Sequence, residues 1–193
     1  EGYDVISLPP KKRHEIAEEL GLSLVPEEDL RAVKSHLHET LEQNTGQTDV
    51  ISQLSDIANE YMLDHFDIEY EFIPPTDEHS FVSESYYLEK LTGLLHNMSV
   101  LPKEMFDNSV VWKIAVDANG LGGDAQTTTE GKYEVNTGKI ALIPESMDDG
   151  AVLIHEIWHS YEIVACKGYD NLKNIYAGIN PPDYRYIDDS WKN

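Results

Sequence analysis

The 193-residue chain has only one cysteine, Cys166, and few basic side chains. A single cysteine cannot form a disulfide within the chain, so packing must stabilise the fold, and a metal site must use His, Asp, Glu or Tyr. Fourteen Lys and Arg residues against thirty-six Asp and Glu residues give a net charge of −22. This charge disfavours direct binding to nucleic acid and would attract a basic partner or substrate, but a simple role in solubility explains it at least as well.

Long hydrophobic runs are also missing. No uninterrupted apolar stretch approaches the roughly 18 to 20 residues that cross a bilayer, and the N-terminus has no apolar signal-peptide core. Apolar residues make up 40% of the chain and charged residues 26%, which is typical of folded domains rather than disordered ones. We therefore expect a folded, soluble protein that does not insert into a membrane. The sequence does not decide its cellular compartment, and secretion is one alternative.

The spacing of apolar residues predicts one domain with a helical N-terminal part, residues 1–66, and a second part, residues 67–193, that contains a sheet and a final helix. Helices are expected at about 10–20, 26–41, 49–66, 82–98 and 148–166, and strands at 68–72, 110–116, 132–135 and 139–143. The fold class is therefore α+β with a small mixed sheet, in which the apolar, β-branched run 110–116 is a central strand. Ser146 and Asp149 predict a capping box at the start of the final helix.

The final helix carries His155, Glu156 and His159 in the sequence His-Glu-Ile-Trp-His. Imidazoles four residues apart lie one turn apart on the same helix face, so His155 and His159 can bind one tetrahedral metal ion. Glu156 is placed to contact a metal-bound water rather than the metal, and zinc lowers the pKa of such a water to about 7. The pattern therefore predicts a zinc site with Glu156 as the general base, although five-residue patterns also occur by chance.

The order of strand, hairpin and HExxH helix over residues 110–166 resembles the zincin zinc metallopeptidases, and is similar to some secreted bacterial effector and toxin proteases. The resemblance implies Zn²⁺ as cofactor and endopeptidase activity on a protein or peptide substrate. In zincins the strand before the active-site helix binds an extended substrate by strand addition. The similar segment here is 139–143 or the neighbouring stretch 122–129.

A catalytic zinc usually takes three protein ligands and one water. The HExxH motif supplies two of these ligands, and the sequence does not identify the third. No histidine follows His159, which excludes the long metzincin motif. The only glutamate after Glu156 is Glu162, on the same helix, so the gluzincin pattern is not met either. We expect Glu162 to support a ligand or to pack.

Aspartates or tyrosines after the helix are the remaining candidates within the chain. The region resembles the aspzincins, in which an aspartate shortly after the helix is the third ligand and a nearby tyrosine stabilises the oxyanion. This resemblance implies Asp170 as ligand and Tyr176 as the catalytic tyrosine, with a spacing that differs from the family motif. Asp183 with Tyr186 keeps the spacing better, and a ligand beyond Asn193 is a further alternative.

Zinc-dependent endopeptidase activity is the leading hypothesis, with Glu156 taking a proton from the attacking water and passing it to the leaving amine. Two alternatives stay open. One is an acidic binding protein that mimics nucleic acid or sequesters a basic partner, with zinc structural or absent. The other is a zinc amidase that uses the same chemistry on a non-peptide substrate.

Overall fold

The computed structural model describes residues 9–46, 49–76, 82–122, 129–168 and 171. Within these residues the order of elements is α1 (Pro10–Leu20), α2 (Glu27–Asn44), α3 (Val50–Phe66), β1 (Glu69–Ile73), α4 (Glu84–Ser99), α5 (Lys103–Asp107), β2 (Lys113–Asp117), β3 (Gly131–Glu134), β4 (Lys139–Leu142), the 3₁₀ helix η2 (Pro144–Ser146) and α6 (Gly150–Ala165). The predicted α+β class with a helical N-terminal part is confirmed. The two short helices α5 and η2 were not predicted.

The helix ends follow local chemistry. Gly21 closes α1 with φ 68°, a left-handed conformation that glycine adopts without steric cost. The Ser83 hydroxyl caps α4 by accepting the amide hydrogen of Tyr86 at 3.3 Å. These ends lie where the sequence pattern placed them.

The start of α6 differs from the predicted capping box. The N-cap is Asp149, whose carboxylate accepts the Ala151 amide at 2.8 Å. Ser146 is instead buried in η2, and its hydroxyl donates to the carbonyl of Glu130 at 2.6 Å and to that of Ile143 at 3.1 Å. The capping role of Ser146 was therefore wrong, because the hydroxyl joins the segment before α6 to the residue before β3.

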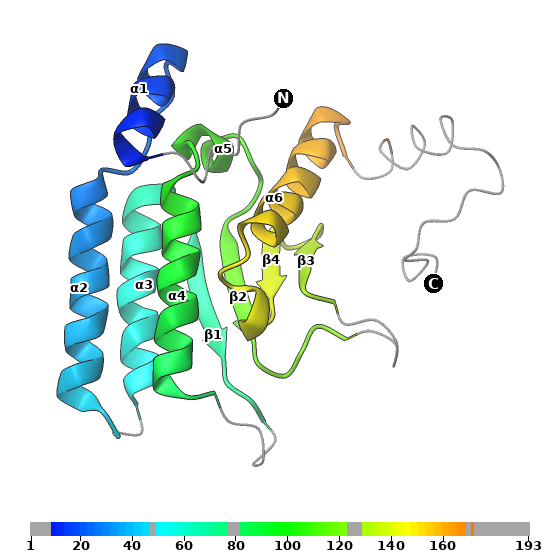
Figure 1. Ribbon diagram of the computed structural model, residues 1–193. Coiled ribbons are helices and arrows are strands. Elements are labelled where there is room, and N and C mark those ends of the chain that lie inside the picture. Colours follow the sequence, from blue (N-terminus) through cyan, green and yellow to red (C-terminus); the bar gives the residue numbers. More distant parts are fainter. Residues whose placement is uncertain (1–8, 47–48, 77–81, 123–128, 169–170, 172–193) are drawn as a thin grey trace.

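The four strands form one mixed sheet in the order β1-β2-β4-β3. The strands β1, β2 and β4 are parallel, and β3 runs antiparallel to β4 at one edge. Figure 1 shows α3 and α4 beside β1, and α6 across β4 and β3. The run 110–116 overlaps β2 from Lys113 onward, and β2 pairs on both sides, so the predicted central strand is confirmed.

One face of the sheet packs against the helices and the other does not. Ile114, Val116, Ile140 and Leu142 alternate along β2 and β4 toward the helices and are fully buried. The core that they join runs from Val25 to residues of α6, so the helical part and the sheet share it. No helix in the described part of the chain is both long and apolar enough to span a membrane.

The opposite face carries two buried alanines and ion pairs between neighbouring strands. Lys113 on β2 lies 2.9 Å from the carboxylate of Glu71 on β1, and Lys139 on β4 lies 3.2 Å from that of Glu134 on β3. The side chains of these pairs are partly accessible to solvent, and such pairs contribute little to stability. The fold therefore depends on the apolar face.

Gly138, in the turn between β3 and β4, allows a test of this packing. Its φ is 63°, and an added Cβ would lie 2.5 Å from the backbone oxygen of Val110. Gly120 has φ 85° but open space around it. We expect Gly120→Ala to lower the free energy of unfolding by about 1 kcal/mol through backbone strain alone. Gly138→Ala should lower it by roughly 1–3 kcal/mol more, because strain and overlap add.

Chemical denaturation of the two variants measures this difference. Both substitutions place alanine at a positive φ, so the comparison isolates the close contacts with the Val110 oxygen and the Trp112 ring. Equal losses of stability would show that the turn relaxes at no cost and that the close contact is unimportant.

Candidate active site

The two histidines of α6 converge as their spacing predicts. The Nε2 atoms of His155 and His159 lie 3.0 Å apart, and the two ring centroids are 4.6 Å apart. Two Zn–N bonds of about 2.0–2.1 Å at a tetrahedral angle place their nitrogens roughly 3.3 Å apart. The pair therefore offers two donors of the right type at nearly the right separation for zinc.

Glu162 supports this pair rather than extending it. Its Oε2 atom lies 3.2 Å from Nδ1 of His159, three residues earlier on the helix. A carboxylate at Nδ1 favours a proton on that nitrogen and leaves Nε2 free to bind a metal. The prediction that Glu162 supports a ligand agrees with this geometry.

Glu156 is buried between α6 and β3, with only 5% of its surface exposed. Burial raises the pKa of its carboxyl above the ordinary value, and the His159 and His155 rings and a hydrogen bond from the backbone amide of Tyr133 offset part of the rise. A carboxyl with a raised pKa is a better proton acceptor near neutral pH than an exposed one. The position suits a general base.

Gly131 at the start of β3 makes room for this carboxylate. A Cβ on Gly131 would lie 2.6 Å from Cγ1 of Val152 and 3.2 Å from Oε1 of Glu156. Only glycine leaves α6 and β3 this close without displacing one of them. The helix therefore crosses the strand at Gly131, and the Tyr133 amide can reach Glu156.

The outer edge of β3 pairs with no strand in the described part of the chain. The Ile143 amide donates to the Glu130 carbonyl at 3.2 Å, so the alternation of antiparallel pairs turns the backbone groups of Gly131 and Tyr133 away from β4. These groups face the side on which Glu156 lies. Among the described strands, the edge next to the candidate base therefore belongs to β3.

This finding corrects the predicted substrate strand. Residues 139–142 form β4, which pairs with β2 on one side and β3 on the other, so that segment has no free edge for a substrate. Most of the alternative stretch, residues 123–128, lies outside the described residues. Sequence reasoning missed Gly131 and Tyr133 as site residues, although a glycine beside a short predicted strand often indicates a close approach of another element.

The third ligand stays a prediction. The described residues contain no group of three or more His, Cys, Asp or Glu side chains that could hold a metal ion. Asp170, Tyr176, Asp183 and Tyr186 all lie outside the described residues. Of the predicted site residues, the structure brings together His155, Glu156 and His159.

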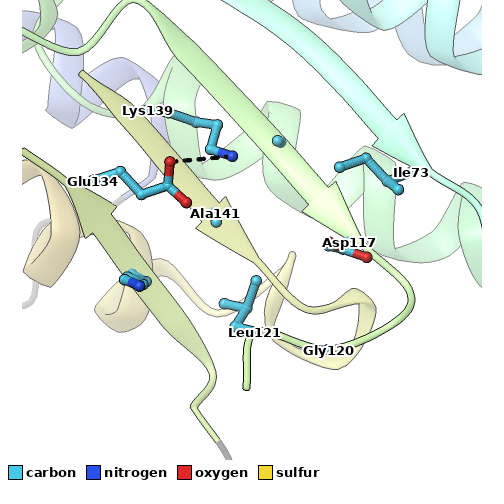
Figure 2. Close-up of a pocket in the computed structure, with 9 residues that line it drawn as sticks. Ile73, Asp117, Gly120, Leu121, Glu134, Lys139 and Ala141 are labelled. Carbon is cyan, nitrogen blue, oxygen red and sulfur yellow. Dashed lines mark ion pairs between the residues drawn. The ribbon is translucent and has the colours of Figure 1, made fainter. Parts of the chain in front are cut away.

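A pocket of about 160 Å³ lies elsewhere, on the face of the sheet that carries the ion pairs (Figure 2). Lys139 and Glu134 in its lining form an ion pair, and Oδ1 of Asp117 accepts the Asn119 amide at 2.9 Å. The side chains of Lys132 and Glu134 alternate along β3 with those of Gly131 and Tyr133, so they lie on the opposite face from Glu156. This pocket is separate from the candidate active site.

Gly131→Ala tests the close contact at β3. The new methyl group overlaps Val152, so we expect the free energy of unfolding to fall by about 1–3 kcal/mol and the Tyr133 amide to exchange faster with solvent. Val152→Ala removes the overlapping Cγ1 atom. In the double variant, Gly131→Ala should therefore cost less than it does in the parent, and a double-mutant cycle by denaturation measures that coupling. Additive losses would contradict the contact.

Comparisons with known proteins leave the candidate site to be judged on its geometry. No family model matches the chain, and neither a curated protein nor a solved structure was found to be similar to it.

Proposed function

We propose that this chain is a zinc-dependent endopeptidase in which His155 and His159 hold the metal and Glu156 is the general base. The observation that carries the proposal is the position of Glu156: a buried carboxyl with a raised pKa, next to one of two converging histidines and beside the outer edge of β3, which pairs with no other strand in the described part of the chain. A buried carboxyl is costly unless it has partners or a chemical role. This combination supports hydrolysis better than ordinary packing.

A zinc ion bound by the two histidines would polarise the scissile carbonyl and lower the pKa of a water beside Glu156 to about 7. The Glu156 carboxylate would accept one proton from that water as its oxygen attacks the carbonyl carbon. The same carboxyl would then give the proton to the leaving nitrogen as the C–N bond breaks. Glu162 would hold the His159 ring in place through Nδ1.

The substrate is proposed to bind as an extended strand along the outer edge of β3. The backbone N–H and C=O of Gly131 and the C=O of Tyr133 point outward from the sheet. They can form hydrogen bonds with a peptide backbone, as in other cases of strand addition. The Tyr133 amide, by contrast, faces Glu156 and helps to lower the pKa of its carboxyl. This register would bring the peptide chain to the side of β3 where the base lies.

The net charge of −22 favours a basic substrate. Long-range attraction of this kind speeds the encounter between oppositely charged proteins and weakens as salt screens it. A protein or peptide rich in Lys and Arg therefore fits the proposal best, and an acidic one fits it least.

Substitutions in α6 separate the roles of its three polar residues. His155→Ala and His159→Ala should each lose bound zinc, because each removes a donor. Glu156→Gln should keep the zinc and lower kcat about 10²- to 10⁴-fold, the usual contribution of a general base. Elemental analysis of zinc per chain and the rate of peptide hydrolysis measure the two effects.

The exposed His38 on α2 supplies a matched control, since His38→Ala removes an imidazole far from α6. It should change neither zinc content nor rate. If elemental analysis finds no zinc in the parent protein after incubation with zinc, that result would count against the metal site. Hydrolysis by Glu156→Gln at the parental rate would count against the base, and partner binding without hydrolysis would favour the acidic binding protein.

The stability of the metal-free protein gives a second test. Because the pKa of Glu156 is raised in the folded state, the parent loses stability as pH rises from the unfolded value of about 4.3 through the folded pKa. Glu156→Gln does not ionise and can still accept the Tyr133 amide. We therefore expect it to be more stable than the parent at pH 7, with an advantage that shrinks as the pH falls through the folded pKa and is gone below about pH 4.3.

Denaturation at several pH values in the presence of a chelator measures this advantage. Glu42→Gln removes an exposed carboxyl on α2 and controls for the loss of one negative charge. A Glu156→Gln variant that is less stable than the parent at pH 7 would indicate that the carboxylate has a structural role instead.

A further inference from the structure

Asp148, two residues before α6, is held by one face of α4. Nζ of Lys90 donates to Oδ1 of Asp148 at 2.6 Å and to the backbone carbonyl of Glu145 at 3.1 Å. Nδ2 of Asn97 donates to the backbone carbonyl of Asp148 at 2.8 Å. Lys90 and Asn97 are two helical turns apart, so they project from the same stripe of α4.

Gly93 lies between them on that stripe and brings the two backbones together. A Cβ on Gly93 would lie 2.4 Å from Cβ and 3.3 Å from Cα of Asp148. A side chain there would push Asp148 away from α4. Asn97 is itself buried, with 7% of its surface exposed, so its hydrogen bond is shielded from water. Three residues of α4 thus define where the chain enters α6.

The entry point of α6 sets the position of its functional residues. Asp148 precedes His155 by seven residues, a distance of about 10 Å along a helix. Further along α6, the Tyr161 hydroxyl donates to the Met105 carbonyl of α5 at 2.6 Å. A shift of Asp148 would therefore tilt α6 about Tyr161 and move the Glu156 carboxylate relative to β3.

We propose that Lys90, Gly93 and Asn97 are positioning residues that hold the Glu156 carboxylate against β3 through Asp148. The inference rests on the proposed function, because the position of Glu156 matters to hydrolysis only if it is the base. A misplacement of about 1 Å can cost on the order of 100-fold in rate. The Lys90–Asp148 ion pair is partly exposed, with 18% of the Lys90 side chain accessible, so it adds little to overall stability.

Hydrogen exchange of the Tyr133 amide in the metal-free protein tests the positioning without any substrate. We expect Asn97→Ala and Lys90→Met to speed its exchange roughly tenfold or more, because its acceptor Glu156 moves. The Trp112 amide, which donates to the Gly138 carbonyl at 3.0 Å just before β2 and β4 begin, should keep its parental rate.

Asn59→Ala is the matched control. Oδ1 of Asn59 accepts the Tyr70 amide at 2.8 Å, so this variant also loses an asparagine bond to the backbone, but between α3 and β1. It should leave the Tyr133 amide unchanged. Faster exchange at Trp112 and Tyr133 alike, faster exchange of Tyr133 in Asn59→Ala, or no change in any variant would each overturn the positioning role.

Steady-state kinetics then connect the position to the reaction. Asn97→Ala and Lys90→Met should lower kcat about tenfold or more with parental zinc content and a KM close to the parent's. A parental kcat in both variants would overturn the inference. A parent that hydrolyses no peptide would overturn the proposed function instead, and the exchange experiment would still decide whether α4 positions Glu156.

Discussion

The close approach of α6 to β3 is the contact on which the candidate site depends. It is achieved because Gly131 has no side chain where Val152 and Glu156 lie against the strand. The same approach buries the Glu156 carboxyl and brings it to the amide of Tyr133. On a helix further from the sheet, Glu156 would be an exposed carboxyl of ordinary pKa next to two histidines. One packing contact thus supplies the burial, the hydrogen bond and the direction of the side chain.

This arrangement has a cost that the rest of the fold must offset. A buried carboxyl loses hydration, and one backbone hydrogen bond and two neighbouring imidazoles compensate for only part of that loss, as the direction of its pKa shift indicates. The sheet residues Ile114 and Leu142 are fully buried under the helices and supply stability through apolar burial. The segment before α6 is tied to α4 by Asn97 and to the residue before β3 by Ser146. The core and these hydrogen bonds together hold α6 in place, although the burial of the Glu156 carboxyl is unfavourable.

The sequence predicts the elements better than their pairing. Apolar periodicity located the long helices and the central strand because those signals are local, and the spacing of His155 and His159 is a property of one helix. The five-residue α5 is too short to show a period, and the partner of Ser146 is a carbonyl sixteen residues away. The pairing of β4 on both sides and the contact of Glu156 with Tyr133 are likewise tertiary. Local patterns therefore find the histidine pair and leave the surroundings of Glu156 undetermined.

The burial of Glu156 also bears on the choice between an enzyme and an acidic binding protein. A protein that attracts a basic partner by charge needs exposed carboxylates, and the chain's net charge of −22 provides an ample field for that. Glu156 is withdrawn from the surface and adds little to such an attraction, yet it bears the desolvation that an exposed residue would avoid. Binding alone gives no reason for this desolvation, whereas a proton acceptor beside a metal benefits from the raised pKa that desolvation causes. Under the proposed function, the exposed charges would attract a basic peptide and the buried carboxylate would act as the base.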